Sequence, residues 1–403
     1  MKSAPLIAIA PDSFKGTLSA GEAAEAIAEG LKRAIPRARF RLIPMADGGE
    51  GTVDAVIAAT HGGWRRCRVR DPMGRMITAR YGWVGGCAPR AVIEMAAASG
   101  LPLLKPGERN PLVASTEGTG DLLRDALNRG VRQIRMGIGG SATNDGGTGM
   151  ARALGVRFLD HRGHDLPPGG GTLVALDRIM FDGLDLRVRQ VSIEVACDVT
   201  NPLCGPNGAS AIYAPQKGAT PPMVRRLDAG LRRLATVATR QTGVDVADVP
   251  GAGAAGGLGF GLMAFCGARL RNGVEMVADA VELEKQCCGC DLVITGEGRI
   301  DGQTVNGKTP MGVARVASRI GVPVIAICGC TGEGWENVHT VGITAVFSST
   351  TSPLTEKGAV TGAAERLIRC AEEVGRLLAI GAHVQAPPVR RSPRHCAIKK
   401  GTG

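Results

Sequence analysis

Acidic side chains follow apolar segments of this chain in four places, where a predicted strand turns toward a predicted helix. The polar residues of these turns are Asp12, Ser13 and Lys15; Asp47 with Gly48 and Gly49; Asp198 and Asn201; and Glu297, Arg299 and Asp301. Ligands of open parallel sheets bind beyond the carboxyl ends of the strands, because loops and helix N-termini converge there. Carboxylates at such an edge can hold Mg²⁺ or accept a proton. Helix capping explains a single aspartate equally well, but four acids at one edge favour a functional site.

A glycine-rich segment, MGIGGSATNDGGTGMARALG at 136–155, has the composition of a phosphate-binding loop. It follows an apolar strand, opens a helix and carries Gly139, Gly140, Ser141, Thr143 and Asn144 in its first half. Glycine lets backbone N–H groups approach an anion, and a helix N-terminus adds favourable partial charge. Hydroxyl and carboxamide groups can complete contacts to phosphate or Mg²⁺. Acids, a phosphate cradle and nearby cations together favour phosphoryl transfer.

A second segment, GQTVNGKT at 302–309, spells the P-loop pattern G-x-x-x-x-G-K-[ST]. In a P-loop the strand runs directly into the first glycine. Here the apolar strand ends near Thr295, and Thr309 followed by Pro310 predicts an N-cap and the first helical residue. The match is therefore interpreted as accidental, although Lys308 can still face the site as a neighbour of Asp301.

A third segment, GAGAAGG at 251–257, contains the dinucleotide-binding spelling G-x-G-x-x-G. VADVP precedes it where an apolar strand is required, and Pro250 adjoins the first glycine. Close packing or a helix start is the preferred interpretation. A nicotinamide-dependent oxidoreductase is accordingly the disfavoured enzymatic alternative.

The elements that must position these residues are short apolar segments, each followed by a turn and an amphipathic helix. The two ends of the chain supply predicted strands at 6–10, 40–45, 291–295, 322–327 and 343–347, with helices at 20–35, 50–59, 311–319 and 358–379. The middle supplies a hairpin at 76–83 and 90–95 and further strands at 132–138, 156–160 and 191–197. Continuous apolar strands that alternate with helices predict largely parallel sheets covered on both faces.

The order of these elements predicts an α/β protein of two domains, the second inserted in the first. Residues 1–65 and 285–380 form a discontinuous, doubly wound outer domain of five strands, and residues 66–284 form the inserted α/β domain. Residues 381–403 are predicted to be a basic, Pro-containing disordered tail.

Bulk composition excludes several classes of protein. Much of the net charge of +11 lies in the tail, and no aromatic residues are interleaved with basic ones, so specific nucleic-acid binding is not expected. The twelve cysteines include a C-x-x-C at 287–290 and a C-x-C at 328–330, but neither pair has the sequence context of a zinc site. The first apolar stretch is too short for a signal peptide, and no run reaches the length of a spanning helix, so a cytoplasmic protein without membrane contact is expected.

Eight longer motifs resemble the bacterial glycerate kinase family, of the glycerate 2-kinase type of glyoxylate and glucarate breakdown. They are APDSFKGTLSA, PMADGGEGT, IEMAAASGL, GIGGSATNDGG, ACDVTNPLCGPNGA, YAPQKGA, PGAGAAGGLGF and ITGEGRID followed by QT-x-x-GK-x-P. The resemblance covers residues 6–380. It implies ATP-dependent, Mg²⁺-assisted phosphorylation of D-glycerate, with the 2-hydroxyl favoured, in a cleft between two α/β domains. A homodimer is left open.

The resemblance leaves individual roles as hypotheses. Asp47 or Asp198 is expected to accept the hydroxyl proton, and Asp198 and Asp301 are alternative ligands of Mg²⁺. Lys15, a candidate catalytic cation, and Arg299 are candidates for the substrate carboxylate, with Ser13 beside them. Arg109 is a weaker candidate. The phosphate contacts are assigned to Gly139, Gly140, Ser141, Thr143, Asn144 and Lys308.

Two non-catalytic alternatives stay open on the sequence alone. A nucleotide- or sugar-acid-binding protein would use the same site without releasing ADP, and a nucleic-acid-associated protein would depend on the tail.

Overall fold

The computed structural model of the chain describes residues 4–352, 358 and 360–381. The chain divides into two compact units, of which unit 1 is Met1–Met45 with Val281–Gly403 and unit 2 is Ala46–Ala280. The boundaries predicted from the sequence, 65/66 and 284/285, differ from these. The first boundary lies earlier than predicted because helix α2 (Thr52–Thr60) packs on strands of unit 2. The predicted tail lies, from residue 382 onward, outside the described residues.

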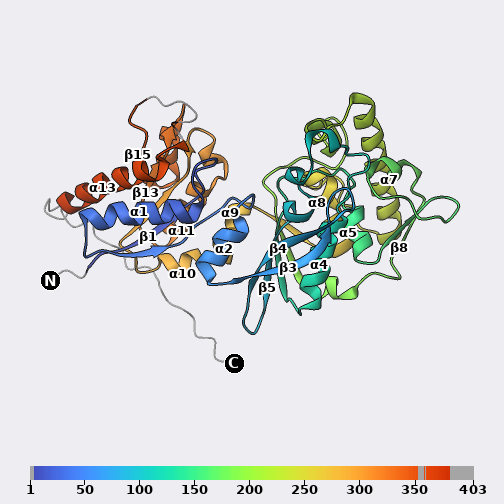
Figure 1. The fold of residues 1–403 in the computed structure, drawn as a ribbon, viewed down its shortest axis with the longest axis horizontal. Helices are drawn as coiled ribbons and strands as arrows, with labels where there is room; N and C mark the ends of the chain where they lie inside the picture. Colours follow the sequence, from blue (N-terminus) through green and yellow to red (C-terminus); the bar gives the residue numbers. More distant parts are fainter. Residues whose placement is uncertain (1–3, 353–357, 359, 382–403) are drawn as a thin grey trace. The chain divides into compact units, whose positions relative to one another are not determined.

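Unit 1 contains a five-stranded parallel sheet in the order β15-β13-β11-β1-β2 (Figure 1). Its strands are β1 (Leu6–Pro11), β2 (Arg39–Leu42), β11 (Leu292–Gly296), β13 (Val324–Cys328) and β15 (Ile343–Ser348). The prediction of five parallel strands from the two ends of the chain is confirmed. The strands β11 and β13 are buried along their whole length, as expected for apolar strands covered on both faces.

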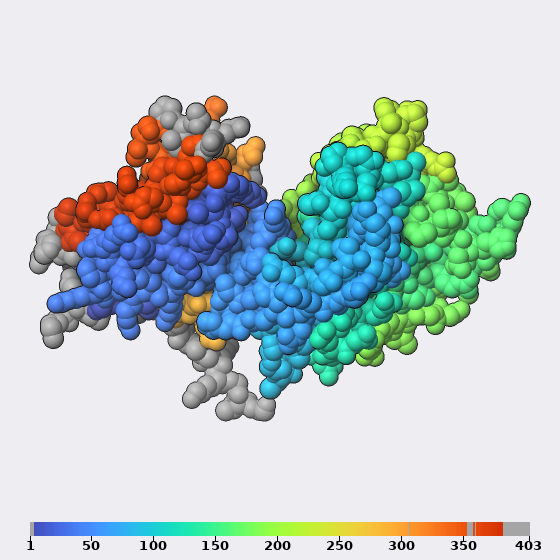
Figure 2. All heavy atoms as spheres, viewed as in Figure 1, coloured from blue at the N-terminus to red at the C-terminus, as the bar shows by residue number. Residues whose placement is uncertain are grey.

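Two long helices pack side by side in unit 1, α1 (Ala20–Ala34) and α13 (Ala363–Gly381). Ser19 caps α1 as predicted, in a capping box with Glu22. The helices approach closely at Gly30, where an added Cβ would lie 2.1 Å from the carbonyl oxygen of Ile368. Figure 2 shows α13 (red) against the surface of α1 (blue).

Further described elements of unit 1 lie outside its five-stranded sheet. They are α10 (Leu283–Cys287), β12 (Arg299–Ile300), a 3₁₀ turn (Thr304–Asn306), α11 (Thr309–Arg319), β14 (Cys330–Thr331) and a second 3₁₀ turn (Trp335–Val341). Strands β12 and β14 pair in parallel as a separate two-stranded sheet.

Unit 2 contains a six-stranded mixed sheet in the order β10-β9-β6-β5-β4-β3. Its strands are β3 (Gly63–Arg70), β4 (Met76–Val84), β5 (Arg90–Glu94), β6 (Gln133–Gly137), β9 (Ser192–Ala196) and β10 (Arg269–Arg271). Strands β3, β4 and β5 form an antiparallel meander, and β5, β6, β9 and β10 are parallel. The predicted α/β class is confirmed, whereas β3 was not recognised because its apolar residues are interrupted by arginines.

The predicted strand at 156–160 lies outside the main sheet. Strand β7 (Arg157–Leu159) pairs instead with β8 (Arg178–Met180) in an antiparallel two-stranded sheet. The chain packs closely against Gly183 just before this strand, since Gly155 has a φ of +99° and an added Cβ would lie 1.9 Å from the Gly183 carbonyl oxygen. The segment therefore forms a short ribbon rather than another parallel strand.

The described helices of unit 2 pack around this sheet and build its apolar core. They are α2, α3 (Ala96–Ser99), α4 (Glu117–Asn128), α5 (Thr148–Ala153), α6 (Ala209–Tyr213), α7 (Pro221–Thr242), α8 (Ala254–Cys266) and α9 (Gly273–Ala280), with 3₁₀ turns at Leu101–Leu103, Pro106–Glu108, Gly170–Ala175, Leu186–Arg189 and Pro215–Lys217. Aromatic residues are few, and Phe158, Phe260 and Phe265 cluster edge to face in this core.

Candidate active site

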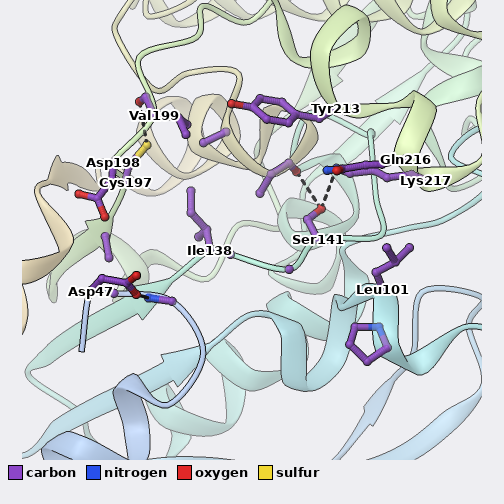
Figure 3. A pocket seen from close by; sticks show the side chains of 18 residues that line it. Asp47, Leu101, Ile138, Ser141, Cys197, Asp198, Val199, Tyr213, Gln216 and Lys217 are labelled. Atoms are coloured by element: carbon purple, nitrogen blue, oxygen red, sulfur yellow. Dashed lines mark hydrogen bonds between the residues drawn. The ribbon is translucent and has the colours of Figure 1, made fainter. Parts of the chain in front are cut away.

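A pocket of about 540 Å³ opens in unit 2 beyond the carboxyl ends of β6 and β9 (Figure 3). Its walls come from residues 47–49, from 138–141 after β6, and from 196–199 after β9. The other side of the pocket is closed by residues that precede α7 and by the start of α8, namely Tyr213, Gln216, Lys217, Ala254 and Ala255. The position agrees with the rule that ligands of parallel sheets bind at the carboxyl edge.

Two carboxylates, Asp47 and Asp198, lie at one end of the pocket. Their segments approach closely because Gly273 has no side chain, and an added Cβ there would lie 1.9 Å from the Asp47 carbonyl oxygen and 2.8 Å from Asp198 Oδ2. Asp198 Oδ1 accepts hydrogen bonds from Asn272 Nδ2 at 2.8 Å and the Gly273 amide at 2.9 Å. Burial raises the pKa of Asp198, the Gly273 amide opposes this, and the negative charge of Asp47 adds to the rise.

The glycine-rich loop after β6 forms the floor of the pocket with Gly139, Gly140 and Ser141. Gly140 has a φ of +71°, a left-handed conformation that glycine adopts without strain. Within the described residues, none of these three amide N–H groups donates a hydrogen bond. Successive unpaired amides at a pocket surface form a binding site for anions.

The remainder of the loop is held from behind by Asp145. This fully buried carboxylate accepts hydrogen bonds from the Thr116 amide and hydroxyl and from the Gly147 and Gly149 amides, at 2.8 to 3.1 Å. Burial raises its pKa against these hydrogen bonds, which lower it. Asp145 thus fixes the loop rather than reaching the pocket.

Thr143 and Asn144, two predicted phosphate ligands, are also fully buried. Asn144 Nδ2 donates to Ser210 Oγ at 3.0 Å, and the Thr143 backbone carbonyl faces a lysine. Their side chains therefore support the loop.

That lysine, Lys217, lies at the end of the pocket opposite the two carboxylates (Figure 3). It ends the 3₁₀ turn before α7 and is only 2% exposed. Its Nζ donates to Ser141 Oγ at 3.1 Å and to the Thr143 carbonyl oxygen at 2.7 Å. Burial lowers the pKa of Lys217 to about 7, although the charge of Asp145 opposes this.

Unit 1 carries a separate polar cluster beyond the carboxyl ends of β1 and β11. Asp12 is buried and accepts hydrogen bonds from the Ser13 amide and the Thr309 hydroxyl. Glu297 Oε1 accepts from Thr304 Oγ1 at 2.8 Å. Burial raises the pKa of Glu297 to about 7, opposed by Thr304 and Lys308 and assisted by Asp12 and Asp301.

The cations of this cluster are partly paired with its acids. Lys308 Nζ lies 3.4 Å from Asp301 Oδ1 and 3.8 Å from Glu297 Oε2. Arg299 Nε lies 3.5 Å from Asp301 Oδ2, with its side chain 64% exposed. Lys15 is exposed in the turn after β1, and Gly298 packs against that turn. The structure therefore brings Ser13, Lys15, Arg299, Asp301 and Lys308 to one edge of unit 1.

Arg109 belongs neither to the pocket of unit 2 nor to the polar cluster of unit 1. It follows the 3₁₀ turn Pro106–Glu108 in unit 2, and its backbone packs against Gly218. Its Nε is buried without a hydrogen-bond partner in the described part of the chain.

Both alternative glycine motifs have the local structure expected of accidental matches. Strand β11 ends at Gly296, and α11 begins at Thr309 with Lys308 as its N-cap, one residue earlier than predicted. Segment 251–257 starts α8 without a preceding strand, and Ala255, Gly256 and Gly257 have positive φ values. The carbonyl of Ala255 accepts a hydrogen bond from Ser141 at 3.3 Å, so this segment supports the pocket wall.

Sequence reasoning missed Lys217 and gave Glu297 no role. The motif YAPQKGA contains Lys217, but nothing local indicates that its ammonium turns back toward a loop 76 residues earlier. Glu297 follows a strand as predicted; its raised pKa depends on burial that only the fold reveals.

Other kinds of site are not supported. The described residues contain no group of three or more His, Cys, Asp or Glu side chains arranged for a metal ion. The cysteines among the described residues form no disulfide bond. No helix among them is long and apolar enough to cross a membrane.

Comparison with known proteins agrees with the resemblance. The profile of the glycerate kinase family matches residues 7–379. The chain is 54% identical to a glycerate kinase of Halalkalibacterium halodurans over 342 residues, which cover 85% of this chain and 90% of that protein. It is 50% identical to the glycerate 2-kinase of Escherichia coli over 375 residues, which cover 93% and 98% respectively.

A crystal structure of a protein assigned as glycerate kinase 2 from Salmonella typhimurium LT2 has the same fold. It superimposes with a TM-score of 0.87 at 49% identity and covers 94% of this chain and 100% of that chain. A family profile along nearly the whole chain, relatives of matching length and a shared fold lead to one conclusion: this chain belongs to the glycerate kinase family.

Proposed function

We propose that this protein catalyses the ATP-dependent phosphorylation of D-glycerate on its 2-hydroxyl, giving 2-phosphoglycerate and ADP. The relatives named glycerate kinase and glycerate 2-kinase support the reaction and the position of the new phosphate. The observation that carries the proposal is the pocket of unit 2, which combines two carboxylates with a row of amide donors. Phosphoryl transfer needs this combination, because catalysis depends on positioning and charge stabilisation.

The phosphates of ATP are assigned to the loop of Gly139, Gly140 and Ser141. Its three amides have no hydrogen-bond partner within the described residues and can replace water around phosphate oxygens. A volume of about 540 Å³ exceeds what a three-carbon acid fills and is in the usual range for drug-sized ligands.

The proton of the 2-hydroxyl is assigned to Asp198 or Asp47. An aspartate near the attacking oxygen accepts its proton as the oxygen bonds to the γ-phosphorus and the bond to ADP breaks in line. The raised pKa of Asp198 makes it a better base than an exposed aspartate. A base of this kind raises the reaction rate by about 10²- to 10⁴-fold.

The same two carboxylates fit Mg²⁺. Magnesium binds through one or two carboxylates and otherwise through water and phosphate oxygens. Asp198 and Asp47 repel each other in the pocket, and a divalent cation would relieve that repulsion. When bound, Mg²⁺ neutralises developing charge on the phosphates. Asp301 is the weaker candidate, because Lys308 and Arg299 already neutralise it.

The candidates for binding the carboxylate of D-glycerate, Arg299 and Lys15, lie in unit 1 and stay predictions. Arg299 is the preferred group because its guanidinium is exposed and can bind a carboxylate with two hydrogen bonds. Lys15 is the alternative, with Ser13 beside it. The homodimer and the cytoplasmic location stay predictions.

The decisive experiment follows ADP release from ATP and D-glycerate with Mg²⁺ and identifies the product by ³¹P NMR. We expect ADP release and 2-phosphoglycerate. A non-catalytic binding protein would release no ADP, and accumulation of 3-phosphoglycerate would refute the assigned hydroxyl. A nicotinamide-dependent oxidoreductase would instead change the absorbance of its cofactor in the presence of D-glycerate.

A further inference from the structure

We propose that Lys217 is the cation that binds the outer phosphates of the nucleotide, the role that the P-loop spelling would give to Lys308. The inference rests on the proposed function and adds a residue to it. Three observations carry it: the position of the ammonium, its missing counter-charge and the unpaired amides beside it.

The position of Lys217 aims its ammonium at the phosphate loop. Its Nζ contacts Ser141 Oγ and the Thr143 carbonyl, which lie directly after Gly139 and Gly140. An ammonium has three N–H donors, and the described residues occupy two of them. The third donor and the loop amides are thus available to the same ligand.

The charge of Lys217 lacks a partner in the described structure. It forms no ion pair there, although it is 2% exposed. Asp145 attracts it through space, yet its oxygens accept hydrogen bonds from Thr116, Gly147 and Gly149 instead. A buried charge without a partner is costly, and proteins usually keep one where a ligand completes the pair.

The ligand that completes the pair is assigned as phosphate rather than carboxylate. Three loop amides and one ammonium offer more donors than the two oxygens of a carboxylate require, whereas a polyphosphate presents oxygens along its length.

Binding of an anion must raise the pKa of Lys217, because it stabilises the ammonium. The pKa is about 7 without ligand, so nucleotide binding above pH 7 takes up a proton. Affinity for ADP therefore falls up to about tenfold per pH unit above pH 7, until the pKa of the complex is reached. The other titratable groups of this pocket are Asp47, Asp198, Cys197 and Tyr213. Burial raises the pKa of Asp198, of Cys197 and of Tyr213.

The test measures binding of ADP, without added metal, by isothermal titration calorimetry at pH 7 and pH 9. At pH 8, two buffers with different ionisation enthalpies give the number of protons taken up. We expect wild-type protein to take up close to one proton and to bind ADP more weakly at pH 9. Lys217→Met should lower ADP affinity at pH 7 about 10- to 100-fold and abolish the uptake, as loss of a charged hydrogen bond predicts.

Lys105→Met is the matched control, since it removes an exposed lysine of the same unit. Lys217→Arg keeps a positive charge above pH 9, and its ADP affinity should not change between pH 7 and pH 9. Thermal unfolding of each variant without ligand separates a loss of folding from a loss of binding. The uptake measured on wild-type protein does not depend on any variant.

Two results would overturn the inference. One is a wild-type ADP affinity that is constant between pH 7 and pH 9 with no proton uptake. The other is a folded Lys217→Met protein that binds ADP normally but has lost affinity for D-glycerate, which would assign the carboxylate to Lys217. The proposed function fails separately, if wild-type protein releases no ADP from ATP and D-glycerate.

Discussion

Two glycine-containing segments of this chain could each be taken for a phosphate loop, and they differ in structure. Residues 137–147 of unit 2 begin at the last residue of β6 and contribute residues 138–141 to a pocket. Three of their amides have no hydrogen-bond partner within the described part of the chain. Residues 302–309 of unit 1 begin six residues after β11, and the Gly302 amide donates to the Glu333 carbonyl at 2.9 Å.

Their lysines differ in the same way. Lys308 is 34% exposed and pairs with Asp301 and Glu297. Lys217 is buried and, among the described residues, donates only to a hydroxyl and a carbonyl. A phosphate site thus depends on unused donors and on a cation without a carboxylate partner, and the order of letters in a motif specifies neither.

The largest expected effect tests whether the catalytic carboxylates lie in the pocket of unit 2. Asp198→Asn and Asp47→Asn should each lower kcat, by about 10²- to 10⁴-fold for the residue that acts as base. Asp301→Asn in unit 1 should lower it less than tenfold. Steady-state ADP release measures all three. If both pocket variants keep a near-normal kcat and Asp301→Asn loses most of it, the catalytic carboxylate belongs to unit 1.

The next effect concerns the support of the loop in unit 2. Asp145→Asn places an amide N–H₂ among the donors of Thr116, Gly147 and Gly149, so it should cost about 3 kcal/mol of unfolding free energy. Urea denaturation measures the change. Asp165→Asn, which removes an exposed partner of Arg157, should change it by less than about 1 kcal/mol. Equal effects would show that the loop does not depend on Asp145.

The acid beside Lys308 should respond to pH. Burial raises the pKa of Glu297 from 4.5 to about 7, so the folded protein binds this proton more tightly than the unfolded chain does. The resulting cost of ionisation is absent below pH 4.5, grows as the pH rises to 7 and is complete above it, at up to about 3 kcal/mol.

Glu297→Gln removes this cost. The variant should gain unfolding free energy relative to wild type at pH 8 and should show no such gain near pH 4.5, as urea denaturation at the two pH values would measure. A gain of the same size at both values would refute the raised pKa. Glu284→Gln, an exposed acid of the same unit, is the control.

The smallest expected effect compares the two segments glycine by glycine. Gly140 has a φ of +71°, and Gly140→Ala should cost about 1–2 kcal/mol of unfolding free energy and weaken ADP binding. Gly302 has ordinary dihedral angles, and an added Cβ there meets its nearest neighbour, the Glu333 carbonyl oxygen, at 3.4 Å. Gly302→Ala should therefore change both quantities little. Thermal unfolding and calorimetry of the pair decide whether the backbone of 137–147 is the specialised one.

The fold was predictable where the local pattern also determines the long-range partner. Segments 6–10, 291–295 and 322–327 are apolar throughout, which requires burial on both faces, and they form β1, β11 and β13. Strand β3 was missed because four arginines interrupt its alternation, and β7 was misplaced because three residues do not show which sheet they join.

The site was predictable in part for a related reason. Asp47, Asp198, Gly139, Gly140 and Ser141 follow strands directly, and their carboxyl-edge position follows from topology. Lys217 reaches the pocket from a turn that no strand precedes. Thr143 and Asn144 are buried and do not line the pocket, and Asn144 Nδ2 donates to Ser210 Oγ instead. Such orientations depend on tertiary packing.

The sheet of unit 1 also affects how the chain can fold as it is synthesised. Strand β1 pairs with β11 in a register that joins Ile7 to Leu292. Unit 2 is continuous and can complete its core first, whereas the edge of β1 opposite β2 must await β11, which emerges from the ribosome almost 300 residues later. Such non-local pairing is slow and leaves a strand edge open to aggregation. Chaperones that hold the nascent N-terminus would therefore be expected to raise the yield of native protein.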